Sequence, residues 1–315
     1  MNYGTLGSLK NISKLSLGGG GIANVWGAVE RQEAIATVHL ALEAGINLFD
    51  MAPGYGDGEA EDIIAESFLG KPPQHVSVTS KCWLQNTHMT SIATTLRESL
   101  ERSLERMKLA HVDIFFLHNP IIPDAQVGNY EGVSYSHFNS EVVPTLESLV
   151  AEGLTKHWGI TGVGVPQVIL QILESQKAPS VIQALTNPTN SAATLKTFDE
   201  PTQARNIIQS ASQKGIGVMG IRAVGAGAFT DTLDRTLSDT HPVMQDYKRA
   251  QPFRSLAKEL GVSAAYLAHQ YALSMSGVST VVLGAKNRIE LQECIEAEKA
   301  GQLSDETIDK IDSLW

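Results

Sequence analysis

Short apolar runs alternate with amphipathic segments along the whole chain. The apolar runs are rich in Val, Ile, Leu and Phe, a pattern typical of buried parallel strands. They cover Leu15–Gly18, Asn47–Asp50, Val76–Lys81, Val112–His118, His157–Thr161, Val181–Leu185, Gly217–Arg222 and Thr280–Leu283. Between them, apolar residues recur at helical spacing. Helices are therefore predicted at Arg31–Ala44, Glu59–Leu69, Ser91–Met107, Glu141–Ala151, Pro166–Ser175, Thr202–Lys214 and Ile289–Ala300, with a pair of helices in Gln245–Met275.

This regular alternation favours a (β/α)8 TIM barrel, and a doubly wound open sheet is the alternative. The length of 315 residues suits one such barrel, so we expect a single domain over residues 1–315. Turn residues within Tyr3 to Ile12 predict an N-terminal hairpin that closes the barrel bottom. Residues 119–139 and 223–244 exceed ordinary loop lengths and follow strand ends. We expect them to be functional loops at the C-terminal face.

Composition limits the classes of protein that this chain can be. The hydrophobic fraction is 43%, yet no segment approaches the ~20 uninterrupted apolar residues of a membrane-spanning helix. The N-terminus lacks the basic and apolar pattern of a signal peptide. Only Cys82 and Cys294 are present, far apart, which fits a reducing compartment better than a disulfide framework. A net charge of −10 without basic runs argues against nucleic-acid binding. We therefore expect a cytoplasmic protein with neither a nucleic-acid nor a membrane partner, and the sequence leaves the oligomeric state open.

Four reactive side chains follow three consecutive predicted strands. Asp50 ends the second strand and Tyr55 lies in the Gly/Pro-rich loop after it. Lys81 ends the third strand and His118 ends the fourth. Each of them has an ordinary structural explanation when taken alone. Because neighbouring parallel strands lie only ~5 Å apart and end at the same rim, the four together predict an active site.

The segments that carry these residues resemble the signatures of a known superfamily. They are GINLFDMAPGYGDGEAED at 45–62, TSK at 79–81 and VDIFFLH at 112–118, followed by matches in 153–161, at Gln183 and in VVLGAKNR at 281–288. In these segments the chain is similar to the aldo-keto reductase superfamily, over nearly its whole length. The resemblance implies a nicotinamide-dependent carbonyl reductase on a TIM barrel, with Asp50, Tyr55, Lys81 and His118 as its catalytic tetrad.

The chemistry of carbonyl reduction explains why these residue types are needed. Hydride delivery to a carbonyl carbon develops negative charge on oxygen, so a proton donor and a fixed positive charge lower the barrier. Tyr55 is the expected donor, and the Lys81 ammonium is expected to lower the pKa of its phenol. Asp50 should hold Lys81 charged and in place. His118 should orient the carbonyl oxygen.

Cofactor contacts follow from the resemblance, in which the nucleotide lies across the barrel mouth. Gln183 matches the position that holds the nicotinamide carboxamide. Thr161 followed by glycine stands where the family has Ser-Asn, so one carboxamide contact is altered. Ile221 replaces an aromatic residue that stacks on the nicotinamide, and Arg222 adds a charge that could reach the pyrophosphate or a substrate acid group.

At the expected adenosine end, some residues favour NADP(H) and others favour NAD(H). Gly284, Lys286 and Arg288 precede a predicted helix, a favourable place for a phosphate. Glu290 stands where relatives carry an arginine for the 2′-phosphate, which favours NAD(H) instead. Glu293 matches an adenine contact. On balance NADP(H) is placed ahead of NAD(H).

A small carbonyl compound or a sugar is the expected substrate. Trp26, Trp83 and Asn119 follow strand ends and are predicted to bind it, because aromatic surfaces with few polar groups suit such molecules. The 119–139 loop adds further aromatic candidates, namely Tyr130, Tyr135, His137 and Phe138.

Three other functions use parts of the same residue set. A Schiff-base aldolase would need a neutral Lys81, which Asp50 opposes. A metal hydrolase would need more ligands than Asp50 and His118, and no metal site is expected. A regulatory subunit could retain the cofactor pocket without catalysis, as some members of the resembled superfamily do.

Overall fold

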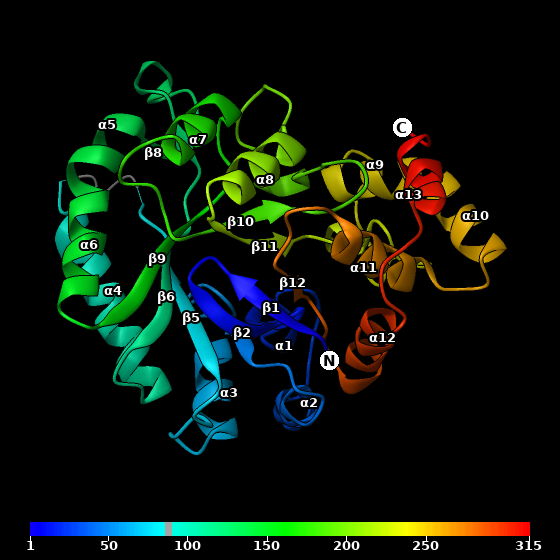
Figure 1. Cartoon of the computed structure of the whole chain (residues 1–315), viewed down its shortest axis with the longest axis horizontal. Coiled ribbons are helices and arrows are strands. Elements are labelled where there is room, and N and C mark those ends of the chain that lie inside the picture. The colour runs from blue at the N-terminus through cyan, green and yellow to red at the C-terminus, as the bar shows by residue number, and fades with distance from the viewer. Residues whose placement is uncertain (86–89) are drawn as a thin grey trace.

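Eight parallel strands close into a barrel in the computed structural model, which describes residues 1–85 and 90–315 (Figure 1). Around the barrel they follow the order β3, β4, β5, β6, β9, β10, β11 and β12. Their bounds are Leu15–Gly18, Leu48–Asp50, Ser77–Cys82, Val112–Leu117, Thr155–Thr161, Val181–Leu185, Gly217–Ile221 and Thr280–Leu283. Each predicted strand is present, and the open-sheet alternative is wrong because β3 pairs with both β4 and β12.

Each segment that was predicted to be helical contains a helix. The helices are α1 Gly19–Ile22, α2 Arg31–Glu43, α3 Glu59–Ser67, α4 Ile92–Met107, α5 Tyr135–His137, α6 Val143–Ala151, α7 Pro166–Leu173, α8 Ala204–Gln213, α9 Pro242–Arg249, α10 Gln251–Glu259, α11 Ala264–Ser274, α12 Arg288–Lys299 and α13 Asp305–Asp312. The structure thereby adds three helices that were not predicted, α1, α5 and α13. Most of the apolar core lies between these helices and the strands.

The predicted pair of helices within Gln245–Met275 is three helices, and the first begins at Pro242. His241 caps α9 by accepting a hydrogen bond from the Val243 amide. Pro252 in the first turn of α10 has no amide hydrogen to donate, so the chain breaks between α9 and α10. The C-terminal helix α13 was not predicted, although Ser304 is a standard N-cap that accepts from the Thr307 amide.

The predicted N-terminal hairpin is present as β1 Tyr3–Leu6 and β2 Leu9–Ser13, an antiparallel pair. In Figure 1 it lies across the barrel in the middle of the view. Its apolar side chains share one buried cluster with residues from the barrel interior: Leu6, Ile12, Leu48, Ile114, Phe116, Val181 and Met219. The hairpin therefore seals the end of the barrel opposite to the strand carboxyl ends.

Both predicted loops contain short structured segments. The first holds the two-stranded pair β7 Ile121–Ile122 and β8 Val133–Ser134. The second begins with a 3-10 turn at Gly225–Gly227 and leads into α9. A separate apolar cluster joins that second loop to α10, α11 and α13, with Phe229 packed edge-on against both Phe253 and Trp315.

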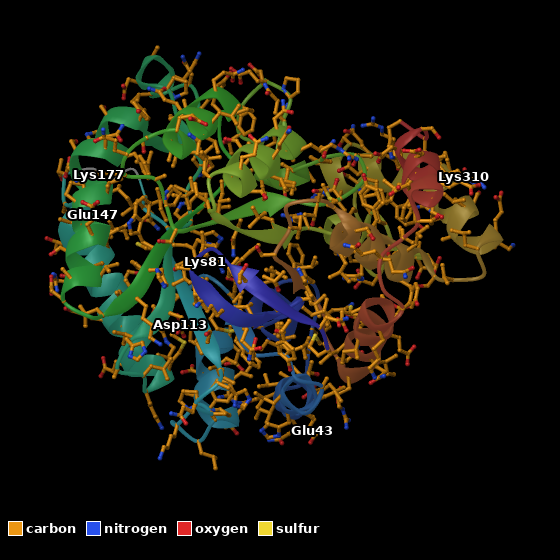
Figure 2. All side chains as sticks on the ribbon, viewed as in Figure 1. Glu43, Lys81, Asp113, Glu147, Lys177 and Lys310 are labelled. Carbon is orange, nitrogen blue, oxygen red and sulfur yellow. The ribbon has the colours of Figure 1, made fainter. Side chains whose placement is uncertain are left out.

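Charged side chains lie mostly at the periphery, and Lys81 is the one lysine or arginine among the described residues that is buried. Figure 2 shows Lys81 in the barrel centre, whereas Glu147, Lys177 and Lys310 lie on the outside. Lys81 is completely buried, with 0% of its surface exposed. A buried ammonium is costly unless it is paired, so its partners identify the site.

Candidate active site

The four predicted reactive residues meet at the rim formed by the strand carboxyl ends. Asp50 ends β4, Lys81 is the penultimate residue of β5, and His118 directly follows β6. The chain turns after β4 so that Tyr55 lies over the same rim, and the Tyr55 amide donates to the Ala52 carbonyl in that turn. Parallel pairing of adjacent strands thus brings together side chains that are up to 68 residues apart in sequence, from 50 to 118.

Lys81 is the centre of the arrangement. Its Nζ lies 2.9 Å from Asp50 Oδ2, donates to the Met51 carbonyl at 2.9 Å, and lies 3.2 Å from the Tyr55 hydroxyl. The same nitrogen is 4.7 Å from the centre of the Tyr55 ring. All three ammonium hydrogens therefore have acceptors, which is how the barrel accommodates a charge with no solvent contact.

Asp50 accepts two further hydrogen bonds that fix its carboxylate. Thr79 Oγ1 donates to Oδ1 at 2.8 Å, and Gln183 Nε2 donates to the same oxygen at 2.9 Å. Thr79 was missed as a site residue, although it lies two positions before Lys81 and so faces the same side of the strand. Gln183 reaches Asp50 from β10. Its side chain was predicted to hold the nicotinamide carboxamide, and its Nε2 group already has a hydrogen-bond partner within the protein.

Burial shifts the pKa of Tyr55 upward. Desolvation raises it, and the nearby Lys81 charge only partly opposes this effect. Lys81 lowers the pKa of the phenol as expected, but burial has the larger effect and sets the net direction. For Lys81, burial lowers the pKa, but the Asp50 and Tyr55 charges more than compensate and raise it. At neutral pH the pair is a protonated phenol beside an ammonium.

His118 is a neutral imidazole at the edge of this pair. Its ring lies 5.8 Å from the Tyr55 ring and 6.0 Å from the Trp83 ring, both close to perpendicular. Burial, with a smaller contribution from the Lys81 charge, lowers its pKa to about 3. It therefore keeps one N–H donor and one free nitrogen acceptor throughout the neutral range.

Two histidines with lowered pKa values, the buried His269 and the half-buried His118, predict an acid-sensitive fold. Burial lowers the pKa of His269 to about 4, and that of His118 to about 3, below the ~6.5 of an unfolded chain. Between these values the unfolded state binds protons that the folded state does not, so the free energy of unfolding falls as pH decreases through this window. Each histidine contributes up to about 1.4 kcal/mol per pH unit. Urea unfolding at about pH 7 and about pH 5 should show the loss.

His269→Gln provides the control for that measurement. Its free energy of unfolding should change less between the two pH values than that of the wild type, because one neutral buried histidine has been removed. An identical pH dependence in both proteins would contradict the assignment of His269.

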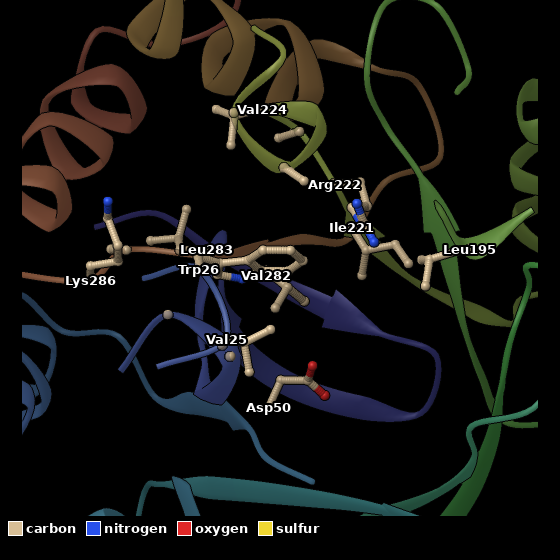
Figure 3. A pocket seen from close by; sticks show the side chains of 18 of the residues that line it. Val25, Trp26, Asp50, Leu195, Ile221, Arg222, Val224, Val282, Leu283 and Lys286 are labelled. Atoms are coloured by element: carbon tan, nitrogen blue, oxygen red, sulfur yellow. The ribbon is translucent and has the colours of Figure 1, made fainter. Parts of the chain in front are cut away.

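A cavity of about 650 Å³ opens beside these residues (Figure 3). Most of the predicted contacts line it: Trp26, Asp50, Tyr55, Trp83, His118, Thr161, Gln183, Ile221, Arg222, Gly284, Lys286, Glu290 and Glu293. Sequence reasoning did not identify some lining residues: α11 contributes His269, and the loops contribute Leu195, Val224, Asp234 and Arg235. Those loop residues carry no pattern that could have marked them, because their position depends on how the loops fold.

Two predicted contacts lie elsewhere. Asn119 is buried, and its amide side chain exchanges two hydrogen bonds with the Leu84 backbone, so it fixes the chain after β5 and does not line the cavity. Arg288 turns away to form a two-pronged ion pair with Glu33 at the start of α2. Asn119 and Arg288 thus have partners within the protein, and the substrate role of Asn119 and the phosphate role of Arg288 stay predictions.

The aromatic residues of the 119–139 loop also have other roles. Phe138 is buried, with its ring 6.4 Å from the Trp158 ring, and the Tyr130 hydroxyl bonds to Asp199 outside the cavity. Pro120 and Glu131 are the residues that this loop contributes to the cavity lining. Packing against the barrel, which the sequence pattern does not distinguish from ligand binding, explains these aromatic side chains.

At one end of the cavity a cation is held between carboxylates. Lys286 pairs with Asp234, and its Nζ also lies 3.5 Å from Glu290 Oε1. The Lys286 amide donates to the other Glu290 oxygen at 2.9 Å. A negatively charged ligand at this end must therefore compete with two acids for one lysine.

Two buried polar atoms in the cavity wall lack a protein partner. Among the residues that the structure describes, none hydrogen-bonds to Thr161 Oγ1 or to Arg222 Nη1. Thr161 is the last residue of β9, and it lies beside Gln183 in the neighbouring strand β10. Buried polar groups normally have partners, so both atoms are fitted to contact a bound ligand. Within residues 1–85 and 90–315, no group of three or more His, Cys, Asp or Glu side chains converges as metal ligands would.

Comparison with known proteins adds four findings. The model of the Aldo/keto reductase family matches residues 14–315. The chain is 26% identical over 310 residues to L-galactose dehydrogenase of Arabidopsis thaliana, covering 96% of this chain and 90% of that protein. It is 24% identical over 336 residues to a probable voltage-gated potassium channel subunit beta of Oryza sativa subsp. japonica, covering 100% and 96%. An aldo-keto reductase from Klebsiella pneumoniae, solved in complex with NADPH, shares the fold with a TM-score of 0.70 at 18% identity, covering 100% and 96%.

Proposed function

Since the chain belongs to the aldo/keto reductase family, we propose that Asp50, Tyr55, Lys81 and His118 form its active site for nicotinamide-dependent interconversion of a carbonyl compound and an alcohol. The observation that carries this proposal is the Lys81 ammonium, bonded to both Asp50 and the Tyr55 hydroxyl at the wall of a large cavity. A bound nicotinamide supplies or accepts the hydride. The protein residues manage the proton and the charge on oxygen.

Tyr55 is the proton donor to the carbonyl oxygen in the reducing direction. Its raised pKa keeps the hydroxyl protonated at neutral pH, which suits a general acid. Once the proton leaves, Lys81 stabilises the phenolate at 3.2 Å. In the oxidising direction the same phenolate takes the proton back from the alcohol.

His118 orients the substrate. Its ring lies beside that of Tyr55, and its low pKa keeps it neutral, so its N–H group can donate to the carbonyl oxygen without adding a charge. Asp50 acts through Lys81: its three hydrogen bonds hold the carboxylate so that the ammonium points at Tyr55.

A dinucleotide fits the remaining residues. The partnerless Thr161 hydroxyl and the Gln183 amide would hold the carboxamide, and Ile221 would pack against the nicotinamide ring. Gly284, Lys286, Glu290 and Glu293 would hold the adenosine end. We place NADP(H) ahead of NAD(H), because Lys286 lines the cavity and the Klebsiella protein with this fold binds NADPH.

Glu290→Gln is expected to strengthen NADPH binding relative to NADH binding by about fivefold to tenfold. The change removes one of the two carboxylates that compete for Lys286, and a unit charge at ~4 Å is worth about 1 kcal/mol or more near a protein surface. Dissociation constants measured by quenching of tryptophan fluorescence test this ratio.

Two variants accompany that measurement. Lys286→Met should change the ratio in the opposite direction, because it removes the cation. Glu296→Gln makes the same charge change on an exposed position of α12 outside the cavity and should not alter the ratio. Equal effects of Glu290→Gln and Glu296→Gln would show that only the overall charge matters.

The alternatives fit the site less well. A Schiff-base lysine must lose its proton, whereas Lys81 has a raised pKa and three acceptors. Borohydride should trap no substrate on this lysine. A regulatory subunit would bind the dinucleotide but turn over no substrate; the rice relative is named a probable voltage-gated potassium channel subunit beta.

The deciding experiment is titration with NADPH and NADH, followed by turnover assays with small aldehydes and aldoses. Binding together with reduction or oxidation of at least one carbonyl or alcohol supports the proposal, and failure to bind either nucleotide overturns it.

The described residues include no helix long and apolar enough to span a membrane. Cys82 and Cys294 are free and buried. The cytoplasmic location inferred from them stays a prediction.

A further inference from the structure

Arg222 is a half-buried cation, and no ion pair joins it to a carboxylate among the residues that the structure describes. It directly follows β11, and its Nη1 is buried without a hydrogen-bond acceptor among the described residues. Its backbone has φ 59°, a left-handed conformation that costs energy in any residue other than glycine. Burial lowers its pKa to about 10, so the side chain is still charged at neutral pH. Because a buried donor without an acceptor is costly, we expect the missing acceptor to belong to a ligand.

The Arg222 guanidinium lies on the side of the cavity away from Lys286, and its charge acts on Tyr55. It lies 5.1 Å from the centre of the Trp26 ring. Figure 3 shows it beside Ile221 on the side toward Leu195, whereas Lys286 lies on the opposite side beyond Trp26. Its charge also acts on Tyr55, whose pKa it lowers slightly against the larger effect of burial.

A second arginine contacts the same indole but has partners. Arg235 lies 6.0 Å from the Trp26 ring, pairs with Asp234 at 3.0 Å, and donates to the Ala226 carbonyl at 2.5 Å. Asp234 also pairs with Lys286. Arg235 is therefore linked to the Lys286 end of the cavity, and Arg222 is the arginine with an unused donor.

We propose that Arg222 binds an oxyanion of the ligand near Tyr55, and that this oxyanion is the carboxylate of an acidic carbonyl substrate. Guanidinium groups bind carboxylates through two parallel hydrogen bonds, and an apolar surrounding strengthens them. Ile221 and Leu195 lie on this side of the cavity (Figure 3). A dinucleotide pyrophosphate has the same chemistry, but Lys286 and Arg235 lie toward the other end. This substrate class rests on the proposed function.

The test uses a matched pair of aldehydes, 4-carboxybenzaldehyde and its neutral amide 4-formylbenzamide. The wild type should prefer the acid in kcat/KM, and Arg222→Gln should reduce the acid-to-amide ratio by roughly 10- to 100-fold, the range for losing charge-assisted hydrogen bonds. Arg222→Lys should retain part of the preference, because it keeps a charge but loses the two-pronged geometry. Arg235→Gln is the matched control and should leave the ratio within about threefold, since its partners lie at the other end.

Binding measurements separate this inference from the proposed function. Calorimetry of benzoate and benzamide with the NADP⁺-loaded protein needs no turnover, and Arg222→Gln should weaken benzoate selectively. A protein that turns over no aldehyde or aldose of the panel contradicts the proposed function, while selective loss of benzoate binding in the same protein still supports the anion site. If Arg222→Gln weakens NADPH and NADH by tenfold or more and leaves the acid-to-amide ratio unchanged, the oxyanion is the pyrophosphate and the proposal is wrong. No change in any ligand also overturns it.

Discussion

Tyr55→Phe is expected to lower kcat for carbonyl reduction by about 10²- to 10⁴-fold, the contribution typical of a positioned general acid. The phenyl ring keeps the shape of the side chain and its contact with His118, but it can give no proton to the carbonyl oxygen. Lys81 keeps its bonds to Asp50 and to the Met51 carbonyl. Steady-state kinetics with a fixed saturating nucleotide provides the measurement.

Dinucleotide affinity should stay within about threefold in Tyr55→Phe, because the hydroxyl is one small group among many contacts. Tyr130→Phe is the matched control: it removes a hydroxyl that bonds to Asp199 outside the cavity, and its kcat should equal that of the wild type. If Tyr55→Phe retains wild-type turnover, another group supplies the proton and the central assignment fails.

Lys81→Met is expected to reduce both activity and stability. Removal of the ammonium leaves the Asp50 carboxylate buried with only its neutral donors, Thr79 and Gln183. Breaking a buried ion pair in this way costs about 3–5 kcal/mol in the free energy of unfolding. Turnover should fall as well, because the phenolate of Tyr55 loses the charge that stabilises it. Urea unfolding and kinetics on the same preparation measure the two effects.

The double variant Asp50→Asn with Lys81→Met isolates the pair. Its loss of stability should be smaller than the sum of the two single losses, because no uncompensated charge stays buried, while its activity should not recover. Lys177→Met breaks the exposed pair with Glu147 and should cost at most about 1 kcal/mol. Additive losses in the double variant would show that Asp50 and Lys81 do not depend on each other.

Local sequence signals were sufficient to predict the barrel. The eight apolar runs coincide with β3 to β6 and β9 to β12, because strands buried on both faces must be apolar along their whole length. Where the prediction differed, a capping or backbone effect was responsible. Pro252 separates α9 from α10, and Ser304 starts α13 in a segment with few apolar residues.

The central part of the site could also be predicted, because strand ends define where side chains converge. The hydrogen-bond partners could not. Gln183 bonds to Asp50 from the opposite side of the barrel. Arg288 pairs with Glu33 of α2, which lies more than 250 positions earlier in the chain. Such pairings depend on the final packing of distant elements. The net direction of the Tyr55 pKa shift required the degree of burial, which no spacing pattern provides.

The bond between Gln183 and Asp50 crosses the barrel, since β10 and β4 are four strands apart in either direction around it. Beneath this bond lies the apolar cluster that the hairpin closes. Water can therefore approach the site from the mouth alone, and the proton that Tyr55 gives up must return by the route through which substrate enters and product leaves. While ligand fills the mouth, deuterium exchange at Lys81 should be slow. In each catalytic cycle Tyr55 should regain its proton only after the product has left.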